Sequence, residues 1–172
     1  MKIFIGVLFF CYCLFGNDLL KIDSYKAEFI QSVTNSSNNT IIYKGDVVIK
    51  QPYYIKWIYK TPIKKYLFII KKQVTIIEPE LEQVIQTKLT KELNILTLIK
   101  QAKHIKNNQY ISKIYDIDYF LTFQDKKLVQ IDYQDELDNH ITIKFTNISY
   151  NIPIDIREFE FNIPYDYDFI SK

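Results

Sequence analysis

The side chains that could do acid–base or metal chemistry in this chain are a few closely spaced aspartates. They stand in pairs at positions 116 and 118, 132 and 135, and 166 and 168. Two neighbouring carboxylates can act as general acid and base, or can bind calcium through their oxygen atoms. On a strand, however, Asp116 and Asp118 would share the polar face opposite Tyr115 and Ile117. That arrangement is typical of a solvated surface rather than of a catalytic site.

Histidine, cysteine and glycine usage argues against several further chemistries. His104 and His140 are the only histidines, and Cys11 and Cys13 both lie in the first segment, so no mixed metal site is expected. After residue 16 a single glycine remains, Gly45. Phosphate-binding loops, dinucleotide-binding loops and nucleophile elbows need clustered glycines for close backbone approach. We therefore expect no catalytic residue, no metal and no cofactor, with a secreted hydrolase built on the aspartate pairs as the remote alternative.

The first sixteen residues have the layout of a secretory signal peptide. A lysine near the start precedes a mostly apolar run, which ends at Gly16 before a polar Asn–Asp pair. The run is shorter than the ~20 residues that a membrane-spanning helix needs. We predict a signal peptide over residues 1–16, cleaved near Gly16, and one exported domain over residues 17–172. That domain contains no cysteine, so it has no disulfide.

Composition and charge favour a β-rich domain without a nucleic-acid site. The chain has 172 residues, of which 48% are hydrophobic, and this is enough to bury a core as one domain. Tyrosine, phenylalanine and isoleucine dominate the apolar residues, and aromatic and β-branched side chains suit strands. The formal net charge is only +2 and the lysines are scattered, so no basic surface for nucleic acid is expected.

Alternating apolar residues predict a meander of antiparallel strands. After a short helical candidate at 17–23, strands are predicted at 24–34, 41–50, 53–60, 65–70, 73–77, 115–123, 127–133, 141–145 and 155–163. Apolar residues at helical spacing predict one further helix over about 91–106: Ile95, Leu98, Ile99, Ala102 and Ile105. The pattern predicts a mainly β fold, a curled sheet or partial barrel with helices over its open side. Periodicity alone does not distinguish a filled interior from a ligand cavity.

The order of these signals resembles the LolA family of periplasmic outer-membrane lipoprotein carriers. The residues that carry the resemblance are Phe29-x-Gln31, the spacing G-D-V-x-I-K-x-P-x-x-x-x-W-x-Y-x-x-P from Gly45 to Pro62, and the element from Pro79 to Val84. The match covers most of the chain after residue 20, although the C-terminal strands match only in pattern. It implies an α+β fold: an incomplete antiparallel β-barrel of about eleven strands with a helical lid.

The resemblance also implies a function. Such a carrier is a periplasmic monomer, not an enzyme, that takes lipoproteins from an inner-membrane ABC transporter and hands them to an acceptor at the outer membrane. A lipoprotein's three acyl chains contain about 40 methylenes, whose exposure to water would cost on the order of 30 kcal/mol. A carrier must therefore supply a dry concave surface. We expect the acyl chains to contact Val47, Ile49, Ile55, Trp57, Phe68, Ile70, Leu96 and Ile99.

Gln51 and Pro52 are the residues expected to control the lid. The resemblance implies an arginine before this proline, which hydrogen-bonds the lid; here the position holds glutamine, which has no charge and fewer donors. Lid closure is therefore expected to be looser, or to use other residues, because Lys50 should point to the opposite face. We expect partners to dock at the rim around Pro52 and the exposed lysines. A lipid- or lipoprotein-sensing half-barrel binding module is the alternative function.

Overall fold

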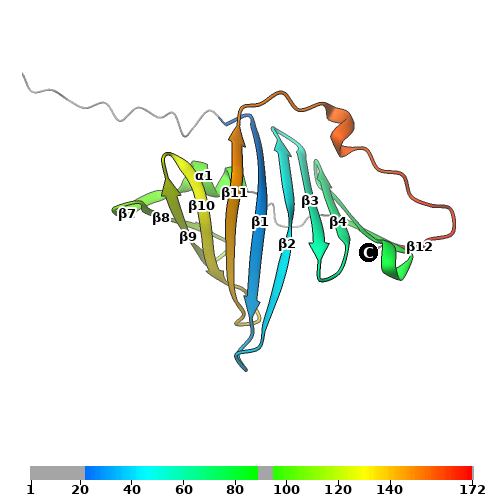
Figure 1. Cartoon of the computed structure of the whole chain (residues 1–172), viewed down its shortest axis with the longest axis horizontal. Coiled ribbons are helices and arrows are strands. Elements are labelled where there is room, and N and C mark those ends of the chain that lie inside the picture. Colours follow the sequence, from blue (N-terminus) through cyan, green and yellow to red (C-terminus); the bar gives the residue numbers. More distant parts are fainter. Residues whose placement is uncertain (1–21, 89–94, 172) are drawn as a thin grey trace, which may run out of the picture.

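The computed structural model describes residues 22–88 and 95–171, and these form a curved, open sheet of twelve strands with a short helix (Figure 1). The strand order is β12-β6-β5-β4-β3-β2-β1-β11-β10-β9-β8-β7. The strands are β1 Ser24–Thr34, β2 Thr40–Lys50, β3 Tyr54–Thr61, β4 Lys65–Ile70, β5 Gln73–Glu78, β6 Gln83–Lys88, β7 Lys103–Lys106, β8 Gln109–Ile114, β9 Ile117–Gln124, β10 Lys127–Gln134, β11 His140–Tyr150 and β12 Asp168–Ser171. The helix α1 is Ile95–Gln101, and short 3₁₀ turns η2 and η3 span Pro79–Leu81 and Ile156–Phe159. The predicted fold class, an open sheet with a helix against it, is confirmed.

The strand connections lie on two opposite rims of the sheet. Thr34 at the end of β1 pairs with both Thr40 and His140, so the β1–β2 and β10–β11 hairpins lie side by side. The antiparallel pairing brings the β3–β4 and β8–β9 connections to the same side. We call this side the hairpin rim (Figure 1, lower edge). The β2–β3, β4–β5 and β9–β10 connections form the opposite rim.

The main core fills the space between the concave face of the sheet and α1. Strand alternation points Tyr25, Ala27 and Phe29 of β1 inward, where they are buried, while Lys26 and Glu28 stay exposed. α1 contributes four buried side chains to the same cluster: Ile95, Leu96, Leu98 and Ile99. A helix of seven residues is too short to be stable by itself, so this burial, worth roughly 6 kcal/mol or more, must hold it in place.

The convex face of β2–β6 is covered by the C-terminal segment, residues 152–167. Ile154 and Phe159 pack against Val48, Tyr54 and Ile70. Further along, Phe161 and Tyr167 pack against the outward side chains of the next strands: Phe68, Ile77 and Val84. The chain then adds β12 to the edge of the sheet, parallel to β6. The sheet is therefore covered on both faces, by different parts of the chain.

Two lysines hold the C-terminal segment to the convex face. The Lys50 ammonium donates to the carbonyl oxygen of Ile154. The Lys56 ammonium donates to the carbonyl oxygen of Glu158 at 2.8 Å and lies 3.5 Å from its carboxylate. The prediction that Lys50 points away from the concave face is thereby confirmed.

Several predicted element boundaries are wrong. Within the predicted helix 91–106, Ile95–Gln101 is helical, but Lys103–Lys106 is the edge strand β7, which carries His104 and the exposed Ile105. Residues 91–94 lie outside the described residues. The predicted strand 115–123 begins at Ile117, because Tyr115 and Asp116 take left-handed conformations (φ 52° and 65°) and make the turn from β8.

The predicted strand 155–163 is also wrong. The Asp155 carboxylate accepts a hydrogen bond from the Arg157 N–H at 2.9 Å and so starts the turn η3. The segment crosses the convex face instead of joining the sheet edge to edge. Because β12 runs parallel to β6, the sheet is not wholly antiparallel. The predicted signal peptide, and residues 17–21 of the first predicted helix, lie outside the described residues; Ile22 and Asp23 are not helical.

Candidate functional site

An apolar cavity of about 190 Å³ lies between α1 and the concave face. Side chains from seven strands and the helix line it: Gln31, Ile49, Ile55, Trp57, Tyr59, Leu67, Ile69, Ile95, Leu98, Tyr119, Ile131, Tyr133 and Ile143. Most of these carry only carbon and hydrogen beyond the backbone. The cavity can therefore accept hydrocarbon without directional contacts.

Six of the eight residues predicted to bind acyl chains lie on this side of the sheet. Ile49, Ile55 and Trp57 line the cavity directly. The other three are buried in the core cluster around it without lining it: Val47, Leu96 and Ile99. On the helix, the neighbouring Ile95 and Leu98 reach the cavity instead.

The other two predicted residues, Phe68 and Ile70, lie on the opposite face. Phe68 packs against Phe161, with ring centroids 4.6 Å apart, and Ile70 packs near Phe159. Leu67 and Ile69 line the cavity in their place. β4 is apolar on both faces, because the C-terminal segment covers its outer side, so its sequence has no alternation from which to assign inward positions.

A cluster of aromatic rings forms one wall of the cavity. Trp57 contacts Phe29 edge to face, with centroids 4.9 Å apart, and stacks near Tyr59 at 6.4 Å. Tyr59 in turn meets Tyr43 edge to face at 5.8 Å. Burial, and then the neighbouring Tyr43 hydroxyl, raises the pKa of Tyr59 to about 12, so its hydroxyl stays protonated and can donate at neutral pH.

Gln51 and Pro52 lie in the β2–β3 turn on the opposite rim. The Gln51 backbone N–H donates to the Asp23 carbonyl oxygen at 2.8 Å, which ties the turn to the start of β1. Within the described residues, the Gln51 side chain makes no hydrogen bond to α1. The role of these two residues in controlling the lid therefore stays a prediction.

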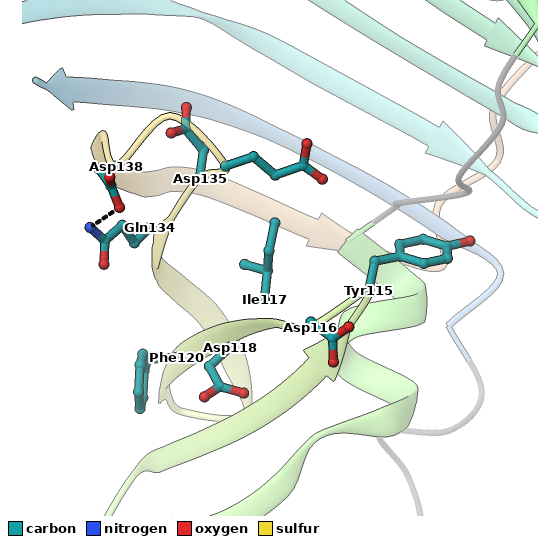
Figure 2. A pocket seen from close by; sticks show the side chains of 9 residues that line it. Tyr115, Asp116, Ile117, Asp118, Phe120, Gln134, Asp135 and Asp138 are labelled. Atoms are coloured by element: carbon teal, nitrogen blue, oxygen red, sulfur yellow. Dashed lines mark hydrogen bonds between the residues drawn. The ribbon is translucent and has the colours of Figure 1, made fainter.

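Aspartates considered for acid–base or calcium chemistry, and interpreted as a solvated face, line a second, polar concavity at the hairpin rim. Figure 2 shows Asp116 and Asp118 near the β8–β9 turn on one side of this concavity, and Asp135 and Asp138 of the β10–β11 hairpin on the other. The Asp135 carboxylate accepts hydrogen bonds from the Leu137 and Asn139 N–H groups of its own turn. The Gln134 amide donates to Asp138 at 3.1 Å. Among residues 22–88 and 95–171, no group of three or more histidine, cysteine or acidic side chains could hold a metal ion.

These features define a class of protein: a half-barrel whose concave face and short helix enclose an apolar cavity. Within the part of the chain that the structure describes, no helix has the length and apolar character to cross a bilayer. The site is thus an apolar cavity enclosed by packed strands and α1. Comparison with known proteins supports the same class.

The family model described as "Outer membrane lipoprotein carrier protein LolA" matches residues 20–120. A protein of Campylobacter jejuni named outer-membrane lipoprotein carrier protein is 33% identical over 171 residues, covering 98% of each chain. A protein of Wolinella succinogenes with the same name is 31% identical over 152 residues, covering 88% of each. A crystal structure of a conserved Thermus thermophilus protein shares the fold, with a TM-score of 0.56 at 9% identity over 89% of this chain and 93% of the other. This chain belongs to the LolA family.

Proposed function

We propose that this chain is a periplasmic carrier that binds the acyl chains of lipoproteins released from the inner membrane and delivers them to the outer membrane. The observation that carries the proposal is the apolar cavity under α1, in a chain whose relatives are named lipoprotein carriers. Burial of hydrocarbon in such a cavity offsets the cost of its hydration during transit. The function needs no catalytic group.

The cavity must enlarge to accept its cargo. Its volume, about 190 Å³, is below the ~300–1,000 Å³ of pockets that hold drug-sized ligands. Three acyl chains are larger than such ligands. α1 is the element that can move, because it is short and is held mainly by side-chain packing. Displacement of α1 by acyl chains would exchange one set of apolar contacts for another and so keep binding reversible.

The proposed partners are an ABC transporter at the inner membrane and an acceptor at the outer membrane. Gln51 and Pro52, in the turn tied to Asp23, are the residues proposed to influence lid opening. The net charge is small, so long-range steering toward these partners is weak, and affinity should fall only moderately with salt.

Trp57, the single tryptophan of the chain, provides the test of the proposed function. Addition of a synthetic dipalmitoyl-glyceryl-cysteinyl peptide to the purified protein should shift Trp57 fluorescence and saturate at one equivalent. The matched control is the double variant Trp57→Phe/Phe68→Trp, which moves the tryptophan to the convex face of the same sheet. Its fluorescence should change little, because Phe68 packs under the C-terminal segment.

Lipids that copurify with the protein from its native periplasm give an independent readout. Mass spectrometry should identify acylated peptides or lipoproteins bound to the chain. The proposal is overturned by a protein that carries no lipid and shows no saturable Trp57 response to the lipopeptide.

A further inference from the structure

On two of the strands that line the apolar cavity, the lining side chains change from hydrocarbon to polar toward the hairpin rim. On β3 the lining residues run Ile55, Trp57, Tyr59 toward the β3–β4 connection. On β10 they run from Ile131 to Tyr133 toward the β10–β11 hairpin. In each case the polar residue is the one nearest the hairpin rim.

Two further strands contribute one polar lining residue each from the part nearest the hairpin rim, whereas β4 and β11 contribute only apolar ones: Leu67, Ile69 and Ile143. Tyr119 lies near the start of β9, beside the β8–β9 turn at that rim, and Gln31 lies in the half of β1 that leads to its hairpin. Ile49 and Ile69, by contrast, lie at the ends of β2 and β4, next to the opposite rim. We call the four polar lining residues, Gln31, Tyr59, Tyr119 and Tyr133, the tyrosine collar.

The polar groups of the tyrosine collar have no hydrogen-bond partner among the described residues. Among the described residues, the hydroxyls of Tyr25 and Ser112 are fully buried without a partner, whereas the collar groups are not among such buried atoms and line the cavity. Tyr119 and Tyr133 lie together, with ring centroids 4.8 Å apart. Burial, and then Tyr119 and Tyr59, raises the pKa of Tyr133, so its hydroxyl is a donor at neutral pH.

We propose that the tyrosine collar binds the polar junction of an acylated cargo, namely the ester and amide carbonyls that join its acyl chains to glycerol and to the first cysteine. This inference rests on the proposed function. Carbonyl oxygens accept hydrogen bonds from tyrosine hydroxyls and from the Gln31 amide, while the apolar end of the cavity offers no polar side chain.

The collar fixes the direction in which the cargo lies. The acyl chains extend toward Ile49, Ile55 and Ile69, and the polar junction stops at the collar. The peptide part of the cargo therefore leaves the carrier over the hairpin rim, between the β1–β2 and β10–β11 hairpins. The opposite rim, with the Gln51–Pro52 turn, then stays clear of the cargo's peptide.

The affinity test removes hydroxyls and keeps the rings. The triple variant Tyr59→Phe/Tyr119→Phe/Tyr133→Phe should bind the dipalmitoyl-glyceryl-cysteinyl peptide at least roughly fivefold more weakly, as expected for the loss of one or more hydrogen bonds. Binding of N-phenylnaphthylamine, an apolar dye without carbonyl groups, should be unchanged. Tyr165→Phe is the matched control, because Tyr165 is fully exposed and lies far along the C-terminal segment. Circular dichroism melts show whether each variant folds.

The orientation test uses the same lipopeptide with a benzophenone on its third peptide residue. After irradiation, mass spectrometry should place adducts on the hairpin rim, in residues 35–41 or 135–139. Adducts confined to the opposite rim, in residues 71–73 or 125–127, would overturn the proposal.

The outcomes separate this inference from the proposed function. Wild-type protein that binds neither the lipopeptide nor the dye contradicts both. Wild-type protein that binds the lipopeptide, with a folded triple variant that binds it equally well, contradicts only the collar. A variant that loses lipopeptide and dye in equal measure also contradicts the collar, because the rings rather than the hydroxyls would then carry binding.

Discussion

Gly45 shows how one residue permits the aromatic wall of the cavity. A Cβ atom at this position would lie 1.8 Å from the Ile58 carbonyl oxygen and 2.9 Å from the Phe29 ring. No side chain fits there without separating β2 from β3. The space left by the missing side chain is filled by Phe29, which contacts both Trp57 and Tyr59. The glycine of the sequence pattern is therefore explained by close strand and ring approach, not by an unusual backbone angle.

Asp135 and Asn35 organise two neighbouring hairpin turns in the same way. The Asn35 side-chain oxygen accepts from the N–H groups of Ser37 and Asn39, both at 3.0 Å. The Asp135 carboxylate accepts from those of Leu137 and Asn139, both at 2.9 Å. One turn thus uses an amide that does not titrate and the other a carboxylate that does.

This difference gives a prediction about pH. Burial tends to raise the pKa of the Asp135 carboxyl, but the hydrogen bonds from Asn139 and Leu137 outweigh it and lower the pKa below its usual value. Its ionised form therefore stabilises the fold above the unfolded pKa, about 3.9, and this contribution is lost as pH falls through the lower folded pKa. Asp135→Asn does not undergo that loss. The stability of the variant relative to wild type should therefore rise as the pH falls from about 5 to about 2.

Urea unfolding at several pH values measures the effect. The site is near the surface, so solvent screening limits it to a fraction of a kcal/mol up to about 1 kcal/mol. Asn35→Asp is the matched control, because it should introduce the same acid dependence into the twin turn. Parallel stability–pH curves for wild type and Asp135→Asn would show that the carboxylate contributes nothing through its ionisation.

Among the elements, the C-terminal segment is the one whose attachment to the sheet depends most on a single buried side chain. Phe159 is 1% exposed and packs against Tyr54 with ring centroids 5.3 Å apart. It is the buried residue of the short turn η3, and its neighbours Glu158 and Ile154 are held by lysines of β3 and β2. β12, at the end of the segment, has only exposed residues and little burial of its own.

Phe159→Ala should therefore release the whole segment from the convex face. The expected loss in stability is about 3 kcal/mol if the segment unfolds with the sheet. Hydrogen exchange should become faster in residues 152–171 and along β6, whose edge β12 pairs with. Tyr165→Ala, at a fully exposed position of the same segment, should change neither quantity. Unchanged exchange along β6 in Phe159→Ala would show that β12 is held independently of η3.

At the scale of the whole molecule, the open sheet divides its two faces between two tasks. The convex face of β2–β6 is closed by the C-terminal segment through aromatic packing and two lysine contacts. The concave face is closed by α1 through apolar packing around a cavity. The convex face therefore stays covered, whereas the concave face can open by displacement of α1.

This division predicts where the molecule responds to cargo. On binding the dipalmitoyl-glyceryl-cysteinyl peptide, hydrogen exchange should become faster in α1, because acyl chains replace its side chains against the sheet. Exchange in β1, β2 and β11, the longest strands at the centre of the sheet, should stay slow. Uniform protection of α1 and sheet alike would mean that the ligand binds without displacing the helix.

The sequence by itself determined much of this protein: the mainly β fold, the strands from β1 to β5, the polar hairpin at 35–40 and the LolA family motif around Gly45. These follow from local rules, namely alternation, turn formers and the spacing of glycine and proline.

The tertiary structure decided which apolar residues face the cavity. Alternation assigns Ile55 and Trp57 to one face, but β4 is apolar on both, so only its neighbours place Leu67 and Ile69 inward and Phe68 outward. The short turn at Tyr115–Asp116 was missed, because neither residue is glycine or asparagine and Tyr115 continues the alternation of the following strand. The turn at Asp125–Lys126 falls between the predicted strands 115–123 and 127–133. The burial of a strand residue depends on which distant segment of the chain covers that face of the sheet, and the local sequence does not specify that segment.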